Sequence, residues 1–398
     1  MMNYRLETDF IGDLEIPADA YYGINAVRGR ENFDVSDDKA DSTLIKSIAW
    51  VKKACALANL DAKEIKKDIA LAIAGACDEL AAGKYDDQFI VNPIQGGAGT
   101  SFNMNANEVI ANIALELLGS NKGKYEIVDP LAHVNMSQST NDVFPAAINI
   151  TLMQKLEPLC RSLLKAADTL LEKSDEMEPA MKMGRTHLNA AVPISFSQCL
   201  NAYATVLIRD YDRIKAAGDD LRWIPLGGTV VGTGYKASPE YRNCVINHLR
   251  EISGAKVEPC RNLADGIQNV DNYTTLSAAL KICALNLSKI ASDLRLLGSD
   301  KQHGIGDLTL SPRQIGSSII ENKINPVMAE LINHVAFLVC GYDSTISMAA
   351  NDGQLELNVF KPVIAFCLFK AIGIMERSIS KFNDYCLRGL SGETSNSP

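Results

Sequence analysis

The chain has 398 residues, of which 47% are hydrophobic and 22% are charged, and this composition is typical of a globular protein with a large core. Its formal net charge is −9, so the surface as a whole repels nucleic acids and anionic membranes, and a small anion has to be bound by a local site. The sequence shows neither a signal peptide nor an uncharged apolar run of membrane-spanning length, which predicts a cytoplasmic protein.

Cysteine and histidine are scattered along the chain. The ten cysteines include no CxxC pair, and the five histidines form no HExxH motif. Several of the cysteines lie inside apolar helical stretches, where a thiol packs as a small hydrophobic group. The sequence therefore predicts reduced core thiols, no disulfides and no metal site.

The first 40 residues contain short, broken segments that we expect to wrap around a helical body. Apolar residues then recur at helical spacing over residues 42–80. A glycine-rich loop, QGGAGTS, follows and leads into another helix through Val109, Ile113 and Leu117. Its backbone N–H groups favour an anion, but the glycine spacing is neither that of a P-loop nor GxGxxG. The loop is thus either a carboxylate site or a plain turn.

Polar side chains gather just before the next long helix. Residues 137–142 include Ser139, Thr140, Asn141 and Asp142, and apolar positions continue at helical spacing from Ile148 to Leu170. Hydroxyls and amides at a helix start either cap the helix or bind a ligand. Pro158 predicts a kink in this helix.

A short connection, KMGRTHL, places Thr186 and His187 before a helix through residues 196–208. A single histidine in such a segment is either a structural or a catalytic group. Residues 226–234, LGGTVVGTG, form a further flexible stretch between helices.

The clearest periodicity belongs to a heptad seam. Its members are spaced alternately by four and three: Leu276, Leu280, Cys283, Leu287, Ile290, Leu294 and Leu297. This predicts a long helix packed nearly parallel to others, either within the chain or between chains. Further helices are expected over about 327–341 and 358–387. No extended strand alternation competes, so the fold class is all-α, with an N-terminal domain at 1–138, a long-helix bundle at 139–390 and a disordered tail at 391–398.

The segment 316–330, GSSIIENKINPVMAE, has the composition of a mobile loop followed by a helix. Gly316, Ser317 and Ser318 are small enough for a loop that closes over a ligand. Lys323 and Asn325 then supply a positive charge and an amide just before a proline that can open a helix. The loop thus suits an anionic substrate, although an ordinary loop and helix cap is the alternative.

Five motifs in this order resemble those of the aspartase/fumarase superfamily, over about residues 4–390. They are GGAGTSFNMNANEV, HVNMSQSTND, KMGRTHL, GGTVVGTG and GSSIIENKINP. The resemblance implies a homotetramer with a central helix bundle, active sites that combine residues of three chains, and no cofactor. It also implies a carbon–nitrogen lyase that eliminates ammonia from L-aspartate to give fumarate through an enediolate. Similar enzymes continue into a small C-terminal domain that the chain is expected to lack.

The resemblance also assigns roles to residues. Ser317 is expected to be the base that removes the Cβ proton, and His187 is the second catalytic residue. The expected substrate-binding residues are Thr100, Ser139, Thr140 and Ser318 on the carboxylate that becomes the enediolate, Asn141, Thr186 and His187 on the amino group, and Lys323 and Asn325 on the other carboxylate.

Three alternatives remain. Fumarate hydratases share the proton-abstraction machinery, although GGAGTS is closer to the aspartases than to the GGSGTQ of fumarases. A different leaving group is suggested by Ile320, Glu321 and Asn322, which stand where the family's loop usually has Met, Pro and a small residue. A catalytically degenerate paralogue that serves only as an assembly subunit is suggested by the charge of Glu321 and the expected missing domain.

Overall fold

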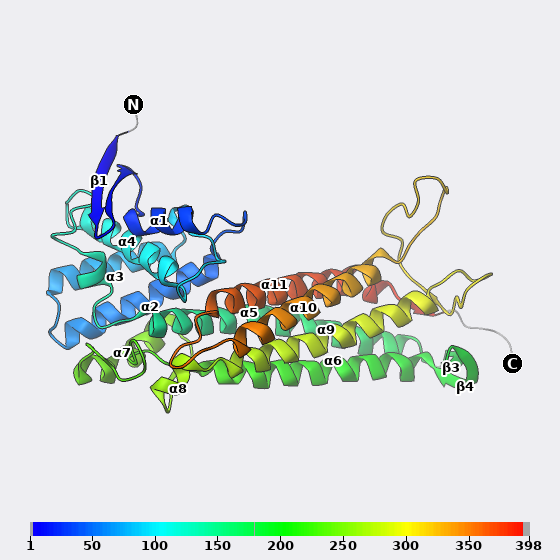
Figure 1. Ribbon diagram of the computed structural model, residues 1–398. Helices are drawn as coiled ribbons and strands as arrows, with labels where there is room; N and C mark the ends of the chain where they lie inside the picture. The colour runs from blue at the N-terminus through cyan, green and yellow to red at the C-terminus, as the bar shows by residue number, and fades with distance from the viewer. Residues whose placement is uncertain (1–2, 179, 393–398) are drawn as a thin grey trace. The chain divides into compact units, whose positions relative to one another are not determined.

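A computed structural model describes residues 3–178 and 180–392 of the chain, and its regular structure is mostly helical (Figure 1). The main helices are α1 (Ile24–Asn32), α2 (Ser42–Asp61), α3 (Lys67–Ala81), α4 (Thr100–Leu117), α5 (Thr140–Glu176), α6 (Phe196–Asp219), α7 (Pro239–Ser253), α8 (Leu263–Gln268), α9 (Asp271–Leu297), α10 (Val327–Asn351) and α11 (Lys361–Tyr385). The predicted all-α class is confirmed. In the described residues, no helix is long and apolar enough to cross a membrane.

Short strands are the feature that the sequence pattern did not reveal. In the described chain they pair as two-stranded sheets: β1 (Tyr4–Asp9) with β2 (Gly12–Pro17), β3 (Met181–Thr186) with β4 (Asn189–Ser195), β5 (Trp223–Ile224) with β6 (Glu258–Pro259), and β7 (Leu308–Thr309) with β8 (Ser391–Gly392). Each sheet is too small to give a sustained alternation of apolar and polar residues. β8 occupies the start of the predicted tail, and residues 393–398 lie outside the described part.

The contacts within the chain divide it into two compact units. Unit 1 comprises residues 1–154, 219–273 and 346–366, and unit 2 comprises 155–218, 274–345 and 367–398. The predicted domain boundary between residues 138 and 139 stays a prediction.

Unit 1 is built on α2, α3, α4 and α7. The predicted helical run over residues 42–80 is two helices, because the chain turns after α2 with a positive φ of 60° at Lys63. Asp41 caps α2 by accepting a hydrogen bond from the Thr43 N–H at 2.9 Å. α2 and α7 are joined in the core, where the Tyr241 hydroxyl donates to Cys55 Sγ at 3.1 Å. These contacts make the α2–α7 pair a firm part of the unit.

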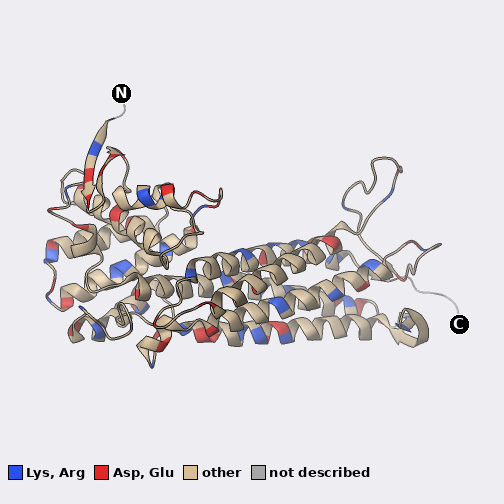
Figure 2. Ribbon diagram, in the orientation of Figure 1, with Lys and Arg blue, Asp and Glu red and all other residues tan. Residues whose placement is uncertain are grey.

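Unit 2 is a bundle of long helical segments. α6 and α9 are joined by the Tyr203 hydroxyl, which donates to Asp293 at 2.7 Å, and α9 and α10 by Lys281 and Asp343 at 2.5 Å. All seven residues of the predicted heptad seam are buried within the single chain. The seam is therefore explained by helix packing inside the chain, which is one of the two arrangements that the sequence predicted. Lysines, arginines and acidic residues are interspersed along these helices (Figure 2).

Gly99, in the turn before α4, and Gly83, after α3, should differ in how much their replacement by alanine destabilises the protein. Gly99 has a φ of 93°, and a Cβ there would lie 2.5 Å from the Phe144 ring. We expect Gly99→Ala to lower the free energy of unfolding by about 2 to 4 kcal/mol, because backbone strain adds to overpacking. Gly83 is the matched control: its φ is 79°, but a Cβ would meet nothing within 4 Å. Gly83→Ala should cost about 1 kcal/mol, and equal losses in urea unfolding would contradict the packing argument.

Candidate functional site

Two helix N-termini meet in unit 1, and each carries a hydroxyl. Thr100 is the exposed first residue of α4, after the glycine-rich loop, and Thr140 is the first residue of α5 and only 8% exposed. The Asn103 amide in the first turn of α4 donates to Thr140 Oγ1 at 3.0 Å, so the two helix starts are in contact. The dipoles of the two helices favour a carboxylate at such a place.

Asp142 fastens a third predicted segment to the same place. Its Oδ1 accepts a hydrogen bond from the Ser139 N–H at 2.9 Å, and its Oδ2 accepts from the N–H groups of Gly227 and Thr229 at 3.0 Å each. The Asn141 amide donates to the Val230 carbonyl at 2.8 Å. Burial raises the pKa of Asp142 to about 6. The structure therefore brings Thr100, Ser139, Thr140 and Asn141 together with the 226–234 stretch.

A buried lysine lies behind this cluster, and the sequence reasoning did not single it out. Lys52, on α2, is fully buried, and its Nζ donates to Asn135 Oδ1 and Gln138 Oε1 at 2.8 Å each. Asn135 Oδ1 also accepts from the Asn103 amide at 3.1 Å, which continues the chain of hydrogen bonds to Thr140. Burial lowers the pKa of Lys52 to about 7. The only sequence signal is a lysine among the apolar residues of a helix that is buried on most sides.

His187 lies in the tight turn of the β3–β4 hairpin in unit 2. Thr186 pairs with Asn189, and the two residues between them have positive φ, 55° at His187 and 63° at Leu188. Two central residues with positive φ match a type I′ turn, which asparagine and glycine occupy more readily than histidine and leucine. Arg185 anchors the hairpin by an ion pair with Asp307 at 2.5 Å. Thr186 and His187 are thus displayed on an exposed, strained tip.

The loop that carries Ser317 is closed at its base by two hydrogen bonds. The Gly316 N–H donates to the Lys323 carbonyl, and the Asn325 amide donates to the Gly316 carbonyl, both at 2.7 Å. A Cβ at Gly316 would lie 2.8 Å from that Lys323 carbonyl oxygen, so only glycine fits there. Asn325 thereby holds the loop shape, and Ser318 and Lys323 are exposed on it.

Ser317 itself is placed to receive hydrogen bonds. Its Oγ accepts from the Ile320 N–H at 2.9 Å and from the Ile319 N–H at 3.2 Å. Backbone donors aimed at a serine oxygen stabilise its deprotonated form more than its neutral form. The local geometry therefore favours a serine that can lose its proton.

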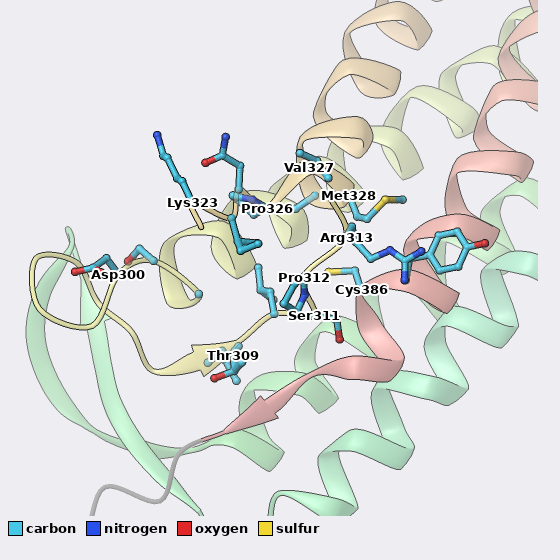
Figure 3. A pocket seen from close by; sticks show the side chains of 18 of the residues that line it. Asp300, Thr309, Ser311, Pro312, Arg313, Lys323, Pro326, Val327, Met328 and Cys386 are labelled. Atoms are coloured by element: carbon cyan, nitrogen blue, oxygen red, sulfur yellow. The ribbon is translucent and has the colours of Figure 1, made fainter. Parts of the chain in front are cut away.

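A cavity of about 540 Å³ lies beside this loop in unit 2 (Figure 3). It is lined by residues 298–301, 308–313 and 322–329 and by the end of α11. At one wall the Arg313 guanidinium lies 4.0 Å from the centre of the Tyr385 ring. Figure 3 shows the Lys323 side chain pointing away from Ser311 and Pro312. Lys323 and Asn325 thus border a space large enough for a small carboxylic acid.

The predicted residues fall into three groups in this single chain. Thr100, Ser139, Thr140 and Asn141 lie in unit 1, Thr186 and His187 lie on the hairpin tip, and the remaining four lie on the 316–325 loop. Within the described part of unit 2, no hydrogen bond or ion pair joins the hairpin tip to that loop. All ten cysteines lie in the described residues and are free thiols, as predicted, although only half of them are fully buried.

Comparisons with known proteins bear on this arrangement. A family model described as "Lyase" matches residues 12–341. The aspartate ammonia-lyase of Bacillus subtilis is 50% identical over 387 residues, which are 97% of this chain and 82% of that protein. A Brucella melitensis structure described as a fumarate lyase:delta crystallin bound to cobalt has a TM-score of 0.97 and 40% identity, covering 98% of this chain and 86% of that one. A class II fumarase from Schistosoma mansoni has a TM-score of 0.95 and 31% identity, covering 98% and 86%.

Proposed function

The chain belongs to the lyase family of the aspartase/fumarase superfamily, and from this premise we propose that it is an aspartate ammonia-lyase. The proposed reaction is the anti elimination of ammonia from L-aspartate to give fumarate. Curated aspartate ammonia-lyases that are 40–50% identical over nearly the whole chain support this choice over the fumarase reaction. The superfamily and the carbon–nitrogen lyase activity expected from the sequence motifs thus agree with the relatives.

One observation of the structure carries the proposal furthest: three loops that are distant in sequence meet at the N-termini of α4 and α5. Hydrogen bonds through Asn103 and Asp142 hold these loops together, with the charge of Lys52 behind them. The Cβ proton of aspartate is only weakly acidic, so its removal requires stabilisation of the enediolate that forms on the adjacent carboxylate. Preorganised donors to such an oxyanion contribute about 3 kcal/mol each.

In this proposal each group of residues has one task. The first set binds the carboxylate that becomes the enediolate: Thr100, Ser139, Thr140 and Ser318. The second set contacts the amino group: Asn141, Thr186 and His187. Lys323 and Asn325 bind the other carboxylate, and Ser317 takes the Cβ proton. Asn325 also closes the loop base, so it positions the loop as well as the substrate.

We further propose a homotetramer whose active sites combine residues from different chains. Support comes from apolar side chains that α9 and α10 leave exposed within unit 2, among them Leu285, Phe337 and Leu338. The 316–325 loop likewise exposes Ile319 and Ile320. Such residues are typical of surfaces that another chain covers. Mass measurement in solution tests this assembly directly.

The reaction is tested by incubating the purified protein separately with L-aspartate and L-malate while the absorbance of fumarate is followed. The proposal requires fumarate from aspartate at a rate far above that from malate. Activity on malate alone would identify a fumarate hydratase. The structural relative from Schistosoma mansoni is named as an enzyme of this kind. N-substituted aspartates should be poorer substrates than aspartate. Higher activity with one of them would indicate that the altered residues 320–322 suit a different leaving group.

At the strained hairpin tip, the effect of a substitution on substrate binding can be measured separately from its effect on folding. Asparagine adopts positive φ readily, so His187→Asn should leave the free energy of unfolding within about 1 kcal/mol of the parent, or raise it slightly. We expect kcat/KM for aspartate to fall at least about tenfold, because the imidazole at the amino group is lost. Leu188→Asn is the control at the neighbouring strained position, with its side chain 72% exposed. If both variants keep full activity, His187 has no role in the reaction.

A further inference from the structure

A cluster of three metal-ligand side chains lies in unit 1, apart from the residues assigned to the reaction. Asp61 ends α2, and Cys244 and His248 lie one turn apart on α7. The ligand atoms of the three side chains all lie within 4.8 Å of one another. His248 Nε2 and Asp61 Oδ2 are 2.7 Å apart, and the Cys244 thiol faces the backbone of both helices, 3.3 Å from the Glu240 carbonyl and 3.8 Å from the Ala58 carbonyl.

The three groups have the chemistry and spacing of a zinc site. A thiolate, an imidazole and a carboxylate are all common Zn²⁺ ligands, and three protein ligands leave the fourth tetrahedral position to water. Usual Zn–S, Zn–N and Zn–O bond lengths imply separations of roughly 3.2 to 3.6 Å between ligand atoms. His248 Nε2 and Asp61 Oδ2 are closer than this range, and all three ligand atoms lie within 4.8 Å of one another, so modest side-chain rotations bring the three atoms into place.

The scaffold and its charge also favour a cation. Cysteine and histidine at positions i and i+4 project from the same face of α7. α2 and α7 are held together nearby by the hydrogen bond between Tyr241 and Cys55, so both sides of the cluster are fixed by the core. Asp61 is at the C-terminal end of α2, where the helix dipole is negative. Each residue is at least partly exposed, which leaves a path for an ion to enter.

We propose that Asp61, Cys244 and His248 bind one zinc-class divalent cation and thereby cross-link α2 to α7. On binding, the Cys244 thiol releases its proton to solvent, the imidazole is neutral, and water completes the coordination. The C-x₃-H spacing of Cys244 and His248 is a weak signal in the sequence, but Asp61 lies more than 180 positions away and only the fold brings it near. The proposal departs from the expectation of no metal site, which rested on local motifs alone and stays a prediction.

The test uses Co²⁺, whose d-electron spectrum reports the ligands directly. The full-length protein, freed of metal by a chelator and kept free of oxygen, is titrated with Co²⁺ and then with Zn²⁺. We expect a thiolate-to-cobalt charge-transfer band and visible bands of tetrahedral intensity that saturate at one ion per chain. Zn²⁺ should abolish both by displacement. Zn²⁺ should also raise the thermal unfolding midpoint of the parent protein.

Matched variants locate the ion. Cys244→Ser should lose the charge-transfer band, and His248→Gln should weaken Zn²⁺ binding in calorimetry by at least about tenfold. Cys260→Ser, which removes another partly exposed thiol of unit 1, should behave as the parent. A Co²⁺ spectrum without a thiolate band, or a band that persists in Cys244→Ser, would overturn the proposal and leave only an Asp61–His248 ion pair. Circular dichroism confirms that each variant is folded, and none of these readouts depends on the lyase reaction.

Discussion

Replacing Ser317 by alanine is expected to reduce kcat for fumarate formation by about 10² to 10⁴, because general-base catalysis contributes a factor of this size. KM should change only a few-fold, since the proposed carboxylate-binding groups remain. The free energy of unfolding should not fall measurably: Ser317 lies in an exposed loop, and its Oγ accepts only the N–H groups of Ile319 and Ile320. Steady-state kinetics and urea unfolding measure both quantities.

The reason for this expectation is the environment of the Ser317 oxygen. A free serine hydroxyl is a poor base near neutral pH, so it has to be activated by hydrogen-bond donors, nearby positive charge and exclusion of water. The structure supplies two backbone donors. With aspartate deuterated at Cβ, residual activity of Ser317→Ala should show a larger isotope effect than the parent, because proton removal becomes rate-limiting. Ser344→Ala, which removes an exposed hydroxyl from α10, is the control and should match the parent. Full activity in Ser317→Ala would remove this residue from the mechanism.

The sequence predicted the long helices well because their apolar residues recur without interruption. The α9 seam from Leu276 to Leu297 is an example: its seven members are all buried. Boundaries were less accurate where local backbone conformation decides them. α2 and α3 read as one run because the turn at Lys63 contains no proline or glycine. α5 continues as helix through Pro158, and the kink expected there stays a prediction.

The site could be predicted only in part, because the environment of its polar residues depends on contacts with residues far away in the sequence. Helix-start hydroxyls such as Thr140 are visible in the sequence, yet their environment is set by Lys52, 88 positions away in a different helix. The type I′ turn at His187 also escaped notice, because neither His187 nor Leu188 is typical of such turns. The family resemblance supplied the roles of these residues, and the three-dimensional arrangement supplied the positions of those in unit 1.

Lys52→Met is expected to raise KM for aspartate and lower kcat/KM at least about a hundredfold. The variant removes the buried positive charge behind Thr140, leaves Gln138 Oε1 without its donor, and takes one donor from Asn135 Oδ1, which still accepts from the Asn103 amide. Leaving a buried amide oxygen without its donor costs about 1 to 3 kcal/mol. Lys53→Met is the matched control on the same helix: Lys53 pairs at 2.6 Å with the exposed Asp78, and surface pairs contribute less than about 1 kcal/mol. It should keep nearly full stability and activity.

The pH dependence separates an electrostatic role of Lys52 from a purely structural one. Burial lowers the pKa of Lys52 to about 7. Between pH 7 and the ordinary pKa of a lysine, the unfolded chain therefore holds a proton on Lys52 that the folded chain lacks. The parent should therefore gain about 2 kcal/mol of stability from pH 7 to pH 9 relative to Lys52→Met. Asp142, Cys55 and Cys77 are present in both proteins, but the charge of Lys52 lowers the pKa of each, so Lys52→Met shifts their titration as well. Over the same pH range the affinity of the parent for aspartate should weaken as the Lys52 ammonium loses its proton. The affinity of Lys52→Met, which is low throughout, should not show this decrease. Parallel pH profiles of the two proteins would exclude Lys52 from substrate binding.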